Sequence, residues 1–163
     1  MSRSGLPSVG EAIAPLLARV PREEQPLLIA YTERLAAARY RAWAEQPAAA
    51  PHAARLLACA EREEEIARRV EALHADAAAR QQRLLAGSPE LLEVNRTLFA
   101  ERPLAEQLAI QAGGERLGAA TWRSFARHAA AAEARDALLA CAALEEASAA
   151  VLEEILAAWG EPA

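Results

Sequence analysis

The second half of the sequence repeats the first. Residues 1–81 align with residues 83–163 without a gap, and 29 of the 81 aligned positions are identical. The helix-breaking prolines coincide in the two copies: Pro7 with Pro89, and Pro21 with Pro103. A repeat of this length indicates that one structural unit occurs twice. We therefore expect a single domain over residues 1–163 in which the two copies pack together.

The composition supports only an all-α fold. Hydrophobic residues make up 53% of the chain but aromatic residues only 4%, so alanine provides much of the apolar content. Ala, Leu, Glu and Arg favour helices, and no segment is typical of a strand. Each copy is predicted to form one short and two long helices, which favours a four-helix bundle with two additional short helices. The short helices are expected at 8–19 and 89–101, and the long ones at 22–46, 52–85, 104–131 and 133–159.

Charge and cysteine usage exclude several classes of partner. The net charge is −5 and no basic cluster occurs, which disfavours nucleic-acid binding. No apolar run approaches the roughly 20 residues of a membrane span, and residues 1–10 lack the apolar stretch of a signal peptide. Cys59 and Cys141 form no CxxC motif, which is typical of reduced thiols. We expect a cytoplasmic protein without membrane or nucleic-acid partners.

One glutamate occupies the apolar face of each long helix: Glu33, Glu63, Glu115 and Glu145. The two copies keep this arrangement, and Glu64 and Glu146 lie at the edge of the same faces. Carboxylates that face one another in an apolar core cannot all stay ionised. They need a bound cation, protonation with shared hydrogen bonds, or an arginine partner. The nearest arginines are predicted to point away from this face, which weakens the third solution: Arg34, Arg62 and Arg116.

A glutamate on one helix and Glu-x-x-His on the next, occurring twice, is the di-iron pattern of ferritin-like bundles. The run Ala60-Glu61-Arg62-Glu63-Glu64-Glu65-Ile66-Ala67 resembles the second-helix motif, and the chain resembles a ferritin-like, rubrerythrin-type protein over essentially its whole length. The resemblance implies a ferritin-like bundle with iron or manganese at the four glutamates, and redox or oxygen-linked chemistry. Ile66 and Ser148 stand where the two histidines would be.

Two hypotheses follow from this departure. In the first, core glutamates alone hold one or two divalent metal ions, because carboxylates are hard oxygen ligands. In the second, the chain is a metal-free, degenerate relative that acts as a structural or interaction module, with glutamates that are protonated or hydrogen-bonded. No nucleotide loop, nucleophile motif or Ser/His/Asp set occurs, so the sequence assigns no catalytic residue.

The remaining candidates have simpler interpretations. Glu71 and His74 form a literal Glu-x-x-His, but His74 lies about 16 Å along the helix from Glu63 and pairs with Leu156 in the repeat. We interpret it as a histidine at the edge of the core. His52 and His128 are expected near helix ends, in surface or capping roles. The cysteines are soft ligands in principle, but buried hydrophobes are favoured. For the aromatic residues at matched positions, packing is favoured over electron transfer: Tyr40, Trp43, Trp122 and Phe125.

The back of the first long helix carries a second apolar stripe that includes Leu28 and Tyr31. A helix that is apolar on two sides is covered on both. Either the short helices or a second subunit, in a homodimer, would supply this cover. Gly113 and Gly114 in the third long helix allow a kink or a close helix approach.

Overall fold

The computed structural model describes residues 5–160, which form seven α-helices, one short 3-10 helix and no strand. In chain order these are α1 (Val9–Leu17), α2 (Gln25–Ala44), η1 (Pro47–His52), α3 (Ala53–Ala72), α4 (Ala77–Gly87), α5 (Leu91–Phe99), α6 (Leu104–His128) and α7 (Ala132–Gly160). The predicted all-α class is confirmed. The outermost parts of the predicted domain, residues 1–4 and 161–163, lie outside the described residues, and so does the start of the segment examined for a signal peptide. Within 5–160, no helix has the length and apolarity to cross a membrane.

The prediction of one long helix over residues 52–85 is wrong. α3 ends at Ala72, where the amides of Leu73 and His74 bond to carbonyls three residues back, as in a terminal 3-10 turn. α4 then folds back over the start of α2, because Gln81 Nε2 donates to the Leu27 carbonyl at 3.0 Å. No proline or glycine marks this break. Tertiary packing overrides helix propensity here.

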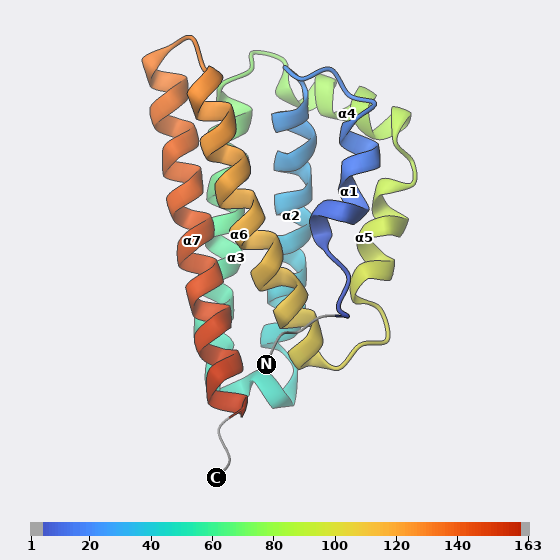
Figure 1. Ribbon diagram of the computed structural model, residues 1–163, viewed down its shortest axis with the longest axis vertical. Coiled ribbons are helices and arrows are strands. Elements are labelled where there is room, and N and C mark those ends of the chain that lie inside the picture. Colours follow the sequence, from blue (N-terminus) through green and yellow to red (C-terminus); the bar gives the residue numbers. More distant parts are fainter. Residues whose placement is uncertain (1–4, 161–163) are drawn as a thin grey trace.

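The four long helices lie side by side (Figure 1). α2 packs along α3, α3 along α7, and α7 along α6. The fourth side, between α2 and α6, has little direct packing, and α1 lies over it in contact with α5 and α6. One side of the helix assembly is therefore closed by a short helix instead of by its long neighbours.

Short segments also cover the back of α2. A separate buried cluster is formed by Leu16, Val20, Leu28 and Leu91, with Tyr31, Leu84 and Leu85 packed against it. The chain thus supplies its own cover for the second apolar stripe of α2. Homodimerisation stays a prediction.

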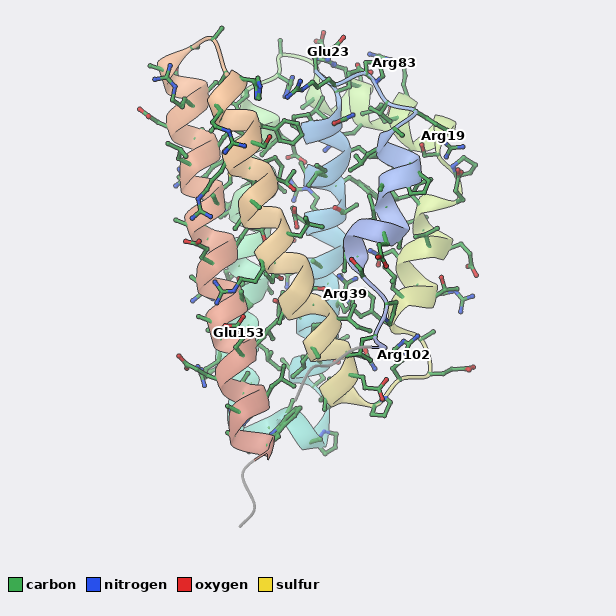
Figure 2. The ribbon with its side chains drawn as sticks, in the orientation of Figure 1. Arg19, Glu23, Arg39, Arg83, Arg102 and Glu153 are labelled. Carbon is green, nitrogen blue, oxygen red and sulfur yellow. The ribbon has the colours of Figure 1, made fainter. Side chains whose placement is uncertain are left out.

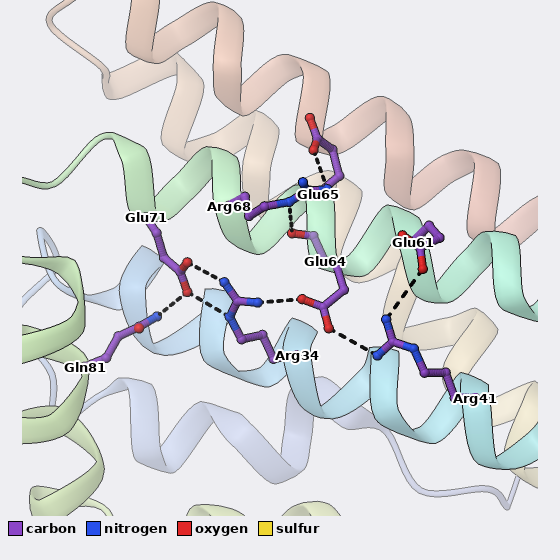
Figure 3. Close-up of polar contacts among 8 residues, drawn as sticks. All are labelled: Arg34, Arg41, Glu61, Glu64, Glu65, Arg68, Glu71 and Gln81. Carbon is purple, nitrogen blue, oxygen red and sulfur yellow. Dashed lines mark hydrogen bonds and ion pairs between the residues drawn. The ribbon is translucent and has the colours of Figure 1, made fainter.

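Two of the ion pairs that join α2 to α3 recur between α6 and α7, at the equivalent positions of the repeat: Arg34–Glu71 and Arg41–Glu64. Arg34 Nε and Nη2 donate to the two oxygens of Glu71 at 3.1 and 2.6 Å, and Arg34 and Arg41 both bond to Glu64 (Figure 3). The equivalent contacts are Arg116 Nε and Nη2 to Glu153, at 2.9 and 2.6 Å, and Arg123 to Glu146, at 2.6 Å. Two-point arginine–carboxylate pairs fix relative orientation as well as distance. Both helix pairs are therefore held in the same register.

Candidate metal centre

Four glutamates from four helices meet in the interior. Only 8% of Glu33, 0% of Glu63, 1% of Glu115 and 2% of Glu145 is exposed. Glu33, Glu63 and Glu145 each offer one carboxylate oxygen, and these three oxygens lie within 4.8 Å of one another. Two oxygens bound to one cation at about 2.0–2.6 Å are at most about 5 Å apart. The trio therefore has the spacing of a cation site.

Glu115 borders the trio and has its own hydrogen-bond donors. Its Oε1 accepts from the Tyr40 hydroxyl and from Gln111 Nε2, both at 2.6 Å. Both donors stabilise negative charge on that oxygen. Its Oε2 is buried without a partner, so one oxygen of Glu115 is fixed and the other is available to a ligand.

Two of the trio also receive a hydrogen bond. Trp122 Nε1 donates to Glu145 Oε1 at 2.8 Å, and the Ser148 hydroxyl donates to Glu63 Oε1 at 3.0 Å. Glu63 Oε2 is buried without a partner. Ile66, one turn after Glu63 on α3, is fully buried. Neither position that the resemblance assigns to a histidine supplies a nitrogen ligand.

Burial makes the charged form of these acids costly. It raises the pKa of Glu33 to about 8, and the nearby charge of Glu115 contributes to this increase. Burial also raises the pKa values of Glu63 and Glu145 well above their ordinary range, with added repulsion from Glu115 and Glu33. These shifts favour the protonated form of the trio where no cation is bound.

The arginines adjacent in sequence to the glutamates point elsewhere, as predicted. Arg34 and Arg116 pair with acids on the outer surface, and Arg62 Nη1 lies 3.4 Å from Cys59 Sγ. Glu64 and Glu146 bind these outer arginine networks and do not face the interior cluster. The outer acids thus form direct ion pairs with arginine, whereas none of the four inner glutamates does so within the described residues.

Sequence reasoning missed Arg39, which lies among α2, α5 and α6 (Figure 2). Its Nη1 and Nη2 donate to Asn95 Oδ1 and Gln111 Oε1, both at 2.8 Å, and its guanidinium stacks 3.9 Å from the centroid of the Phe99 ring. Burial lowers its pKa to about 10. Through Gln111 it is connected to Glu115, and its positive charge partly offsets the repulsion at Glu33.

The sequence contains a signal for the position of Gln111 but none for that of Arg39. Gln111 precedes Glu115 by four residues, so the helical period alone places it on the same face. Arg39 follows Glu33 by six residues and falls outside the apolar face. Only the packing of α5 against α2 and α6 explains its position.

A cavity of about 370 Å³ opens beside the cluster, between α1, α2, α5 and α6. Glu33, Glu115 and Glu145 line it, whereas Glu63 does not. Gly118 permits this exposure, because a Cβ at that position would lie 2.6 Å from Glu145 Cδ. The candidate centre is therefore accessible from one side.

The other sequence candidates lie outside the cluster. His74 is half-buried in the turn after α3, 3.2 Å from Arg80, and burial lowers its pKa. The His52 ring packs against Trp159, and His128 is exposed at the end of α6. Cys59 and Cys141 are buried, which raises their pKa values to about 11 and about 12 and keeps both thiols protonated. Their interpretation as buried hydrophobes agrees with this environment.

The matched aromatic residues pack in the interior, as predicted. Tyr40 packs edge-on against Trp43 at 5.3 Å, and Trp122 lies 5.9 Å from Phe125. Tyr40 and Trp122 also donate to glutamates, a role that packing alone did not predict.

No protein-family model, curated protein or solved structure matches this chain significantly. The interpretation of the site therefore depends on its geometry and chemistry.

Proposed function

We propose that the protein is a ferritin-like four-helix bundle, built from an internal duplication, that binds one or two divalent metal ions through Glu33, Glu63, Glu115 and Glu145. The observation that carries this proposal is the buried trio of carboxylate oxygens within 4.8 Å. The unpartnered oxygens of Glu63 and Glu115 add to it, since buried polar atoms normally have a partner.

The donor set suits iron or manganese. All four groups are oxygen ligands, which bind hard or borderline divalent ions. A cation would take the place of the protons on the trio, and the attraction would offset the repulsion between the carboxylates. A bound iron or manganese ion would supply redox or oxygen-linked chemistry. Tyr40, Gln111, Trp122 and Ser148 would orient the ligands through the hydrogen bonds described above.

The duplication is supported by the recurring contacts. Sequence identity between the two copies shows only that the same residue types recur. In the two-point pairs Arg34–Glu71 and Arg116–Glu153, matched residues also make matched contacts. Two similar helix pairs that face each other would bring two equivalent pairs of glutamates together, Glu33 with Glu115 and Glu63 with Glu145.

A second candidate function is favoured by the same hydrogen bonds. Glu63, Glu115 and Glu145 each already accept at least one hydrogen bond. These bonds satisfy part of the hydrogen-bonding capacity of the carboxyl groups without a metal. In that case the chain is a degenerate ferritin-like relative that acts as a structural or interaction module, with the trio protonated.

Metal analysis separates the two candidates. The protein is purified without chelators, and its metal content is measured by mass spectrometry alongside two double variants. Glu63→Gln with Glu145→Gln removes two ligands from the trio. Glu64→Gln with Glu146→Gln is the matched control, because it changes the adjacent outer acids by the same chemistry.

We expect iron or manganese in stoichiometric amounts in the parent and the control, and its loss in the inner variant. Added Mn²⁺ should raise the melting temperature of the first two proteins only. A parent protein that holds no metal, and whose melting temperature is unchanged by EDTA and by Mn²⁺, would refute metal binding and leave the second candidate.

A further inference from the structure

The cavity beside the glutamates has mostly apolar walls. Val9, Ile13 and Leu17 line it from α1, Ile29 from α2 and Leu117 from α6. Its volume of about 370 Å³ falls in the range of small-molecule sites in proteins. At roughly 30 Å³ for each water-sized group, it has room for about a dozen non-hydrogen atoms.

The cavity is elongated along α6. Its lining runs from Gln111 to Thr121, which corresponds to about 15 Å of helix. Arg39, Asn95 and Gln111 lie toward one end, and Leu17, Ile29 and Thr121 lie toward the other. A ligand that fills it would therefore be long, with one end near hydrogen-bonding groups and an apolar remainder.

Small residues let α1 pack closely against α6 at one edge of the cavity and leave space beside the glutamates. A Cβ on Gly114 would lie 3.1 Å from Val9 Cγ2, so any side chain there would push against α1. Ala36 and Gly118, which occupy equivalent positions in the two copies, face the cavity between Glu33 and Glu145. The middle of a bound ligand would therefore lie directly beside the carboxyl groups.

The charged groups that border the cavity differ in sign between its middle and its hydrogen-bonding end, which favours a neutral ligand. An anionic group would meet Glu33, Glu115 and Glu145. At the hydrogen-bonding end, a cationic group would meet Arg39, whose terminal nitrogens already donate to Asn95 and Gln111. Burying an unpaired charge is costly, whereas a neutral hydroxyl can exchange hydrogen bonds with these amides.

We propose that this cavity binds an uncharged, elongated apolar molecule with a single hydrogen-bonding end, of the size of a medium-chain primary alcohol. The inference deepens the proposed function, because it names the class of molecule that would meet a bound metal. Its role as a substrate rests on the proposed function, but its binding does not.

The test uses the full-chain protein and 1-decanol as the probe, with binding followed by calorimetry and metal content measured in the same samples. Ala14→Trp places a large side chain at the cavity wall on the exposed side of α1. Ala18→Trp is the matched control, because Ala18 is exposed at the end of the same helix and does not line the cavity. Thr121→Trp fills the cavity from α6, and it keeps the test decisive if Ala14→Trp does not fold.

We expect 1-decanol to bind the parent and Ala18→Trp equally, and the dissociation constant to rise at least tenfold in Ala14→Trp and Thr121→Trp. All four proteins should have the same metal content. Absence of binding to the parent, or binding that neither filling variant weakens, overturns the inference. Tighter binding of decanoate or decylamine than of 1-decanol overturns the assignment of a neutral ligand. A metal-free parent that binds 1-decanol in the expected way supports the inference while it refutes the proposed metal function.

Discussion

The hydroxyl of Ser148 on α7 donates a hydrogen bond of 3.0 Å to Oε1 of Glu63 on α3. Ser148 stands at the position where the resemblance to ferritin-like proteins places a histidine. Its hydroxyl provides a hydrogen-bond donor for the buried Glu63 Oε1. Both residues are fully buried. At this position the chain therefore has, in place of a histidine nitrogen, a hydroxyl that donates to the carboxyl group of Glu63.

Replacing Ser148 by alanine should destabilise the metal-free protein by about 1–3 kcal/mol, because Glu63 Oε1 would lose the hydroxyl that donates to it at 3.0 Å. The measurement is urea unfolding in the presence of EDTA. Ser124→Ala is the control, since Ser124 lies half-buried at the outer surface of α6 near Arg22, and it should change stability by less than about 0.5 kcal/mol. If the two variants lose the same free energy of unfolding, the hydrogen bond from Ser148 to Glu63 makes no specific contribution to stability.

The metal-free protein should lose stability as the pH rises from about 5 to about 8. The pKa of Glu33 is raised from 4.5 to about 8 in the folded state, so the unfolded chain releases this proton at lower pH than the folded chain does. Within that window the folded state binds more protons, and the free energy of unfolding falls with pH by up to about 1.4 kcal/mol per pH unit for each such group. Glu63 and Glu145 shift in the same direction and add to the slope.

Urea unfolding at several pH values in EDTA measures this slope. Glu33→Gln should reduce the dependence of the free energy of unfolding on pH, because the amide cannot titrate and the cluster then has one acidic group fewer. Saturating Mn²⁺ should reduce it in the parent, since a metal competes with protons better at high pH. A stability that is flat or rises across this window would contradict the protonated trio.

Local patterns in the sequence were sufficient for the helix boundaries near proline and for the inward position of Glu63. The period of 3.6 residues separates Glu63 from Glu64, and the repeat selects the same residue in the second copy as Glu145. The break after Ala72 was not predictable in this way, because it follows from contacts between α4 and α2. Nor was Arg39, whose place depends on Asn95 and Phe99 of a helix that is distant in sequence. Patterns within one helix describe its faces, whereas the cavity and the charge balance depend on how helices meet.

Replacing Tyr40 by phenylalanine should cost about 1–2 kcal/mol of stability, because Glu115 Oε1 loses the hydroxyl that donates to it at 2.6 Å. Tyr31→Phe on the same helix is the matched control. Tyr31 is half-buried against the cluster on the back of α2 and is not near the glutamates. The two variants are compared by urea unfolding at neutral pH. If Tyr31→Phe proves as costly as Tyr40→Phe, the bond to Glu115 is not a special stabilising contact.

Gly118→Ala should weaken metal binding at least tenfold, because the added Cβ would lie 2.6 Å from Glu145 Cδ and 2.9 Å from its Oε2. The carboxyl group would have to move, and ligand positions tolerate little displacement. Gly113→Ala in the same helix is the matched control, since a Cβ there meets nothing within 4 Å. That variant should gain about 0.5–1 kcal/mol of stability from helix propensity and bind metal as the parent does. Calorimetric titration with Mn²⁺ and urea unfolding measure both effects. If both glycine variants bind Mn²⁺ with the affinity of the parent, the carboxyl group of Glu145 is not a metal ligand.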